Sequence, residues 1–176
     1  MRLVIVILVS VFITNAIEAS AKKGPTLTNY GPIMPVKDMD EPLPENFKYR
    51  AVFDVVSTAS EVDSHSRRLE SVARFINMHT DRGVDIKDID IAVVIHGKAA
   101  KDILTDEAYA TKFQTNNPNK EMIESLAKVG VKFYICGQTS DFRKYSRKDI
   151  LPEVSIALSA MTQLVVYQSK GYALLP

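Results

Sequence analysis

The feature that most restricts how this chain can fold is an unbroken apolar run, Ile91-Ala92-Val93-Val94-Ile95. A strand with one face in water alternates apolar and polar side chains, whereas a continuous run is typical of a strand covered on both faces, as in a parallel sheet between helices. The chain has 176 residues, of which 46% are hydrophobic and 24% charged, which suits one globular domain. We therefore expect a parallel sheet with helices on both faces.

Strand and helix patterns alternate on either side of this run. Further strands are predicted at 49–56, 131–135, 154–158 and 172–175, and helices at 65–80, 98–111 (as one or two short helices), 120–128, 141–145 and 159–170. Such an alternation predicts an α/β fold built on an open parallel sheet.

Two of these helices have apolar stripes that predict their orientation. The helix at 65–80 begins after a capping residue, Asp63 or Ser64, and stops near Gly83. Its inward stripe is expected to be Leu69, Val72, Ala73 and Ile76. The inward face of the helix at 159–170 is expected to be Met161, Leu164, Val165 and Gln168.

The first 21 residues have the pattern of a secretory signal. Arg2 is followed by an apolar run over 3–13, and Ala19-Ser20-Ala21 has the small residues that signal peptidase accepts, so cleavage is expected near Ala19–Ala21. The run is shorter than the roughly 20 apolar residues that span a bilayer. We expect a periplasmic or secreted protein that is free of the membrane after cleavage; the alternative is an uncleaved anchor or a buried strand.

Residues 22–47 differ from the rest of the chain because they hold five of its eight prolines. Neither a helical nor a strand period survives this proline density. We interpret this stretch as an extended N-terminal arm that lies along the domain, residues 48–176, or along a neighbouring subunit.

Charge and motifs exclude several classes of function. The 22 Lys and Arg residues nearly balance the 21 Asp and Glu residues, and a net charge of +1 gives no electrostatic argument for a nucleic-acid partner. The chain has no GxGxxG, GxxxxGK[ST], GxSxG or HExxH motif, which disfavours dinucleotide-binding dehydrogenases, P-loop NTPases, α/β-hydrolases and zincins. His65 and His79 do not have metal-ligand spacing, and we predict neither a metal site nor a cofactor.

The single cysteine, Cys136, is the sharpest candidate for chemistry. It ends a predicted strand and is followed by Gly137, Gln138 and Thr139. The glycine allows a close backbone turn whose amides face the sulfur, and a following helix start would lower the thiol pKa. One cysteine forms no disulfide within its own chain, so export would leave this thiol unpaired. The alternative is an inert cysteine buried at the end of a core strand.

A second strand of the predicted sheet ends in His96 and Gly97. The carboxyl ends of parallel strands share one edge, so His96 is expected near the thiol, where it would orient or deprotonate it or bind an anion. The alternative is a hydrogen-bonded residue in a turn. A basic cluster also follows the cysteine and is either a landing place for an acidic partner or sulfur oxyanion, or a solvated face: Arg143, Lys144, Arg147 and Lys148.

Residues 48–176 resemble the DsrE/DsrF-like family, which includes sulfur-relay proteins with the YchN-like fold. The segment 130–138, in which a glycine precedes a strand that ends in Cys-Gly-Gln, carries most of the resemblance. The other matching segments are 93–97, 117–119, 151–154, 157–162 and 171–175.

The resemblance implies both a fold and a role for the cysteine. It implies three layers, α/β/α, around a mainly parallel sheet of about five strands, and assembly as a homo-oligomer, either a trimer or a hexamer. It implies that Cys136 accepts sulfur as a persulfide. For such a carrier, the residues at the two strand ends are the ones we expect to bind the substrate: His96, Gly97, Gly137, Gln138 and Thr139.

Two functions therefore stay open. The first is an exported single-cysteine sulfur carrier, or sulfurtransferase-like protein, that exchanges sulfur with a donor or acceptor protein or a small sulfur compound. The second is a non-enzymatic, homo-oligomeric binding or assembly module with an inert Cys136, suggested by two apolar residues off the main stripe of the last helix, Val166 and Tyr167.

Overall fold

A computed structural model describes residues 20–176, and its centre is one five-stranded parallel sheet in the order β4-β3-β2-β1-β5. The strands are β1 (Tyr49–Val55), β2 (Ile89–Ile95), β3 (Lys132–Cys136), β4 (Val154–Ala157) and β5 (Ala173–Leu175). The helices are α1 (Arg67–Asp81), α2 (Asp106–Phe113), α3 (Lys120–Lys128), α4 (Gly137–Phe142) and α5 (Ala160–Ser169), with short 3-10 turns at Ile86–Asp88, Gly97–Ile103 and Arg147–Asp149.

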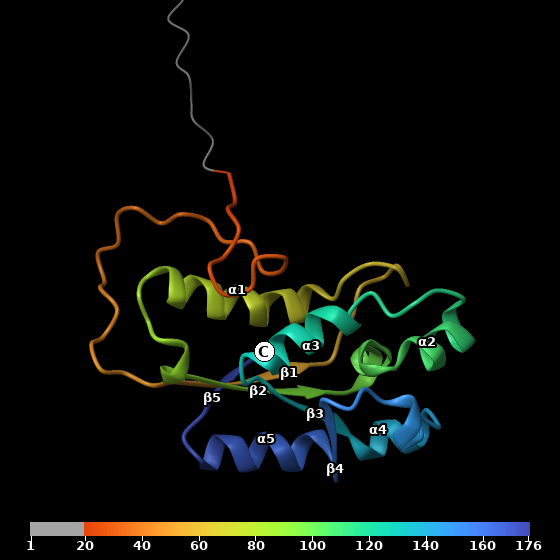
Figure 1. Cartoon of the computed structure of the whole chain (residues 1–176). Coiled ribbons are helices and arrows are strands. Elements are labelled where there is room, and N and C mark those ends of the chain that lie inside the picture. The colour runs from red at the N-terminus through yellow and green to blue at the C-terminus, as the bar shows by residue number, and fades with distance from the viewer. Residues whose placement is uncertain (1–19) are drawn as a thin grey trace, which may run out of the picture.

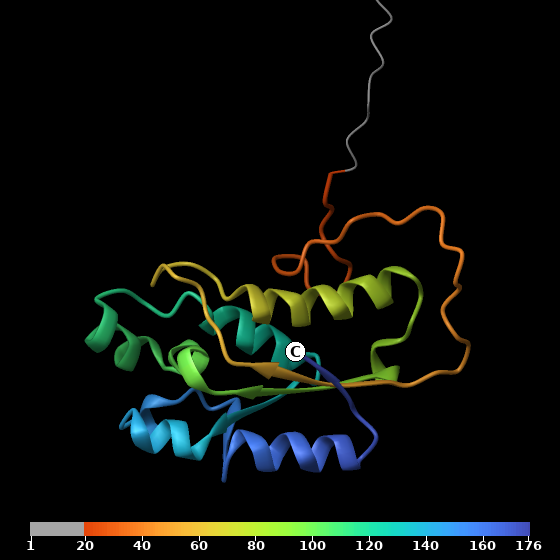
Figure 2. The same cartoon turned by 180° about the vertical axis from the view of Figure 1, so that it is seen from behind.

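The helices form a layer on each side of the sheet, as Figures 1 and 2 show. α1 and α3 cover one face, α5 lies against the other, and α4 packs at the end of β3 beside the turn Gly97–Ile103. This arrangement confirms the predicted α/β fold with a five-stranded parallel sheet.

The apolar run that predicted the sheet lies in its central strand, β2. Ile91, Val93 and Ile95 pack into the core beneath α1 and α3. Ala92 and Val94 pack on the other face, which α5 covers. The strand is unexposed on both faces, which is why its sequence lacks alternation.

Some helix boundaries differ from their predictions. α1 begins after Ser66, not after Asp63 or Ser64, because the Asn119 side chain accepts a hydrogen bond from the Ser66 amide (2.7 Å) and holds the loop extended up to that residue. Gly83, with φ +85°, ends it as expected. The 98–111 region divides into the 3-10 turn Gly97–Ile103 and α2, because the Thr105 side chain caps a new helix by accepting from the Ala108 amide (3.2 Å).

The orientation predicted for α5 is wrong except at Leu164, which packs on the sheet as expected. Tyr167 points inward and is buried, whereas Met161 and Val165, predicted to face the core, are 76% and 63% exposed. The Tyr167 hydroxyl lies 2.9 Å from the Tyr134 hydroxyl, and its ring packs edge-on against Tyr172. α5 has apolar residues all around, so periodicity alone did not fix which side packs on the sheet.

The segment before β1 packs against α1, passes over it and then runs round the sheet to β1 (Figures 1 and 2). Asn77, unexposed on α1, holds it by accepting from the Leu27 amide (2.9 Å) and donating to the carbonyls of Leu27, Tyr30 and Gly31. At Gly31, with φ +60°, a Cβ would lie 2.2 Å from the backbone nitrogen of Arg74, so only glycine allows this approach.

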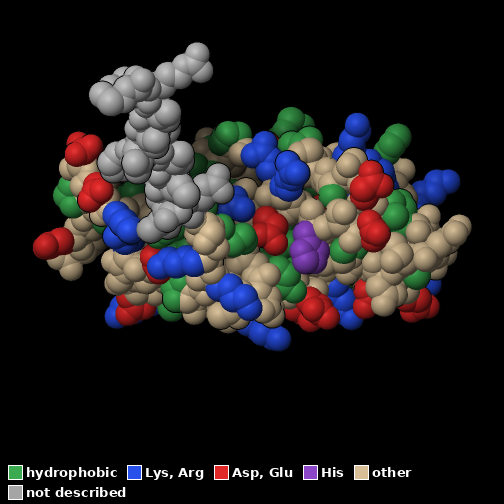
Figure 3. Space-filling view, turned by 90° about the horizontal axis from the view of Figure 1, so that it is seen from above, with side chains coloured by type: hydrophobic (Ala, Val, Ile, Leu, Met, Phe, Trp, Pro, Cys, Tyr) green, Lys and Arg blue, Asp and Glu red, His purple; other side chains and the backbone are tan. Residues whose placement is uncertain are grey.

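The predicted export signal, residues 1–21, lies outside the described residues except for Ser20 and Ala21. Within residues 20–176 no helix has the length and hydrophobicity needed to cross a bilayer. The face seen from above α1 carries basic and acidic side chains interspersed with one another (Figure 3).

Candidate functional site

Cys136 is the last residue of β3 and the residue that precedes α4. The helix predicted at 141–145 begins at Gly137 instead, directly after the cysteine. The composition of residues 137–140 is typical of a loop, which is why the sequence pattern placed the helix too late. The residue is buried, with 6% of its surface exposed.

Hydrogen-bond donors from two helices face the Cys136 sulfur. Burial raises the pKa of the Cys136 thiol, whereas hydrogen bonds from the side chain and the backbone amide of Thr139 lower it. The amides of Ala160 and Gln138 lower it further, and the pKa lies below its ordinary value. These donors stabilise the thiolate, the form of cysteine that attacks sulfur.

Gly137 allows this arrangement because the start of α4 lies directly against the end of β4. A Cβ at Gly137 would be 2.6 Å from the carbonyl oxygen of Ala157 and 3.2 Å from that of Leu158. Any side chain would push α4 away from β4, so the close approach requires glycine at this position.

His96 lies beside the thiol in the sheet, and its described side-chain partner is a carboxylate. Its Nε2 is 2.8 Å from Asp54 Oδ1. Since Ile95 pairs with Ile135, His96 and Cys136 are the next residues of neighbouring strands, about 5 Å apart at their Cα atoms. The residues directly before them, Ile95 and Ile135, face α1 and α3. Because side chains alternate along a strand, His96 and Cys136 both lie on the α5 face.

The other predicted site residues divide between two places. Gln138 and Thr139 surround the sulfur, and the Gln138 side chain reaches the Leu158 carbonyl (3.5 Å). Gly97, directly after His96, has φ +58°, and a Cβ there would meet Val56 Cγ1 at 3.1 Å, so it serves the turn that follows β2 where that turn packs on the residue after β1.

Two contributors to this site escaped prediction. Asp54 is detectable in principle, as a carboxylate within the apolar strand 49–56 that the two-residue period of β1 places on the same face as His96. The Ala160 amide has no sequence signal, because it reaches the sulfur only through the packing of α5 beside β3.

The basic cluster predicted after the cysteine is divided among three places. Arg147 donates to the backbone carbonyls of Val154 (2.6 Å) and Leu151 (3.2 Å). Lys144 and Lys148 line a hollow that also contains acidic residues. Arg143 lines a different cavity at the same edge, so these four side chains do not form one landing place.

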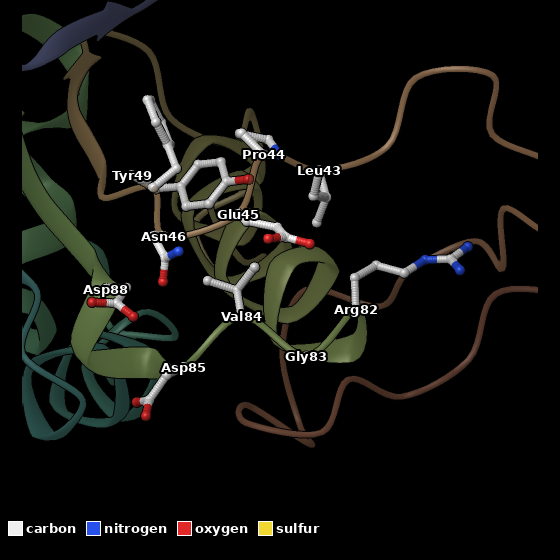
Figure 4. A pocket seen from close by; sticks show the side chains of 11 residues that line it. Leu43, Pro44, Glu45, Asn46, Tyr49, Arg82, Gly83, Val84, Asp85 and Asp88 are labelled. Carbon is white, nitrogen blue, oxygen red and sulfur yellow. The ribbon is translucent and has the colours of Figure 1, made fainter.

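A cavity of about 430 Å³ lies at the opposite, amino-terminal edge of the sheet. Figure 4 shows carboxylates on two segments of its wall, Glu45 before β1 and Asp85 and Asp88 before β2. Because this cavity is at the other end of the strands, it adds nothing to the surroundings of Cys136.

The sequence pattern of the DsrE/DsrF-like family matches residues 50–176, which include every strand but the first residue of β1. The chain belongs to the DsrE/DsrF-like family. No curated protein has a sequence that matches this chain significantly.

Solved structures show the fold of this family member. A protein of unknown function from Methanobacterium thermoautotrophicum is 20% identical, with a TM-score of 0.53 over 73% of this chain and 98% of its own. The ychN protein from E. coli is 16% identical, with a TM-score of 0.52 over 72% of this chain and 96% of its own. At these identities the likeness confirms the DsrE-like fold and shows nothing about the chemistry.

Proposed function

We propose that this DsrE/DsrF-like protein is an exported sulfur carrier in which Cys136 accepts sulfur as a persulfide. One arrangement carries the proposal: the thiol faces amide and hydroxyl donors at the starts of α4 and α5, which hold its pKa below the ordinary value. An inert core cysteine has no need of four such donors. The family's relation to sulfur relay supports the same interpretation.

The sulfur-transfer step balances without an outside oxidant. The Cys136 thiolate attacks the outer sulfur of a donor persulfide, R–S–SH. A sulfur–sulfur bond forms to Cys136 while the donor's own sulfur–sulfur bond breaks, and the donor leaves as R–S⁻ with the bonding electron pair. The proton stays on the transferred sulfur, and an acceptor thiolate removes that sulfur by the same exchange.

The surroundings of Cys136 give each neighbour a role in this step. The amides of Gln138 and Thr139 and the Thr139 hydroxyl stabilise negative charge on sulfur before the attack. His96, held by Asp54, lies on the neighbouring strand and is a positioning residue for the incoming donor.

Sulfur loading tests the proposal directly. We expect the native protein to gain the mass of one sulfur atom after incubation with inorganic polysulfide, and to lose it on treatment with dithiothreitol. Cys136→Ser should gain none, since the chain has no other cysteine. Intact-mass spectrometry measures both, and on protein isolated from the periplasm it also reports whether residues 1–21 have been removed.

The proposal fails if the native protein gains no sulfur, or if Cys136→Ser gains as much. Circular dichroism of the variant provides the control that the fold is intact.

A second candidate function, assembly of several copies, has its own supporting observation. An exposed apolar face begins directly before α5 and continues along it. Its members are Leu158 (73% exposed), Met161 (76%) and Val165 (63%). Met161 and Val165 are one helical turn apart, and Leu158 precedes the capping residue Ser159. A soluble monomer rarely leaves such a face uncovered.

We propose that a second copy of this chain covers this face, in a trimer or hexamer. The double variant Met161→Lys/Val165→Lys is expected to sediment as a monomer at micromolar concentration, because four-carbon ammonium side chains would be trapped in an apolar interface. Met78→Lys, on α1 across the sheet and 44% exposed, is the matched control and should keep the native mass. A native protein that is itself monomeric would contradict the proposal.

A further inference from the structure

A cavity of about 580 Å³ opens at the carboxyl-terminal edge of the sheet, and Cys136 is not among the residues that line it. Its wall comes from the loop between β1 and α1, the turn after β2, the end of α2 and the residue after α4. Three cationic side chains line it, Lys98, Lys101 and Arg143, together with the hydroxyls of Ser57, Thr58 and Ser60.

These three cations have no ion-pair partner among residues 20–176. The Nε of Arg143 is buried and has no acceptor, so one of its donors is left unsatisfied. No acidic residue lines the cavity. Asp102, fully buried behind Thr58, is close enough to Lys101 for that lysine to lower the pKa of its carboxyl group, so one carboxylate behind the wall offsets part of the positive charge.

The cavity is held in shape before any ligand arrives. Lys101 Nζ donates to the Tyr109 hydroxyl (3.1 Å) and lies 5.6 Å from the centre of the Phe113 ring. The same hydroxyl donates to the Val62 carbonyl (2.6 Å), which fixes one end of the loop. Thr58 Oγ1 donates to Asp102 Oδ1 (2.6 Å), which fixes the other.

We infer that this cavity binds a small organic anion with a tetrahedral, doubly or singly charged oxyanion head: a phosphate monoester or a sulfonate. Lys98, Lys101 and the Arg143 guanidinium would contact the head, as charge-assisted donors do in phosphate sites. The apolar part would lie against Phe113 and Val62, which line the same cavity. This inference is independent of the persulfide proposal.

Titration calorimetry with phenyl phosphate and with benzenesulfonate tests it on the native protein. We expect saturable binding of at least one of the two, and the preferred one identifies the head group. Lys98→Met and Arg143→Met should each weaken that binding about tenfold, since each removes a charged donor. Lys98 is exposed, so its replacement does not threaten the fold.

Lys128→Met is the matched control, because Lys128 is an exposed lysine at the end of α3, outside the cavity. It should leave binding unchanged, as should Cys136→Ser. Heat no greater than that of sodium chloride at equal ionic strength would overturn the inference, and so would equal weakening by Lys98→Met and Lys128→Met.

Discussion

Asp102→Asn is expected to stabilise the protein above pH of about 6 and to change its stability little near pH of about 4. Asp102 is completely buried. Its Oδ1 accepts from Thr58 Oγ1 (2.6 Å), whereas Oδ2 has no hydrogen-bond partner. Burial raises the pKa of this carboxyl group from 3.8 to about 6, against smaller lowering effects from Thr58, Lys101 and Ser66. The Ser66 hydroxyl faces the Asp102 carboxyl group but has no hydrogen-bond partner.

The direction of the effect follows from proton binding. The folded protein holds the Asp102 proton more tightly than the unfolded chain, so this residue favours folding fully below pH of about 4 and loses that contribution as the pH rises through about 6. The difference in pKa corresponds to about 3 kcal/mol in the free energy of unfolding. Asparagine does not titrate, and it keeps an oxygen to accept from Thr58, so the variant should lack this loss.

Urea unfolding of both proteins at several pH values measures the effect. Subtracting the two free energies removes the titration of all other groups and should leave a difference that grows by about 2.5 kcal/mol from pH of about 4 to about 8. Asp63→Asn, at an exposed position of the same loop, is the control and should give a flat difference. If the difference in free energy of unfolding between the native protein and Asp102→Asn does not change with pH, ionising the buried carboxyl group does not destabilise the fold.

Elements whose sequence pattern depends on their own burial were predictable. The run at 91–95 has no polar residues between its apolar ones because β2 is covered on both faces. The apolar stripe predicted for α1 matches the side chains that the helix buries. α3 has the predicted bounds, 120–128, because a turn before it and Gly130 after it restrict its ends locally. In each case local sequence and tertiary packing agree.

Features that depend on distant packing were not predictable. The rotation of α5 depends on the pairing of Tyr167 with Tyr134, 33 positions away, and the helix sequence alone favoured the wrong face. The end of β3 was predicted, but the donors at Cys136 come partly from Ala160 on α5. The unsatisfied carboxyl of Asp102 likewise exists only after the loop at Thr58 has folded over it.

The exposed apolar face and the thiol occupy the same end of the sheet, which relates the two proposed functions. Gly137, the residue directly after Cys136, lies against the backbone carbonyl of Leu158, the first residue of this face. A second copy seated on this face would therefore border the sulfur and control which donors reach it. Sulfur loading measured on the Met161→Lys/Val165→Lys variant separates the roles, since a carrier that acts alone retains its loading as a monomer.

Gly137→Ala is expected to damage the thiol site and the fold together. The added methyl carbon would lie 2.6 Å from the Ala157 carbonyl oxygen, which belongs to backbone and cannot rotate away. Separating α4 from β4 should cost about 2 kcal/mol, as overpacking commonly does. The same movement withdraws the amides of Gln138 and Thr139 from the sulfur, so the thiol pKa should rise toward its ordinary value.

The pH dependence of alkylation by iodoacetamide measures the thiol, and urea unfolding measures the fold. Thr139→Val removes one donor without the steric clash, so it should raise the thiol pKa while leaving the free energy of unfolding nearly unchanged. Gly171→Ala should lower the free energy of unfolding by about 1 kcal/mol, because alanine is strained at a φ of +82°, although a Cβ there meets nothing within 4 Å. It should leave the thiol pKa of Cys136 unchanged. If Gly137→Ala alkylates with the native pH profile, the start of α4 does not set the ionisation of Cys136, and the persulfide proposal loses the observation that carries it.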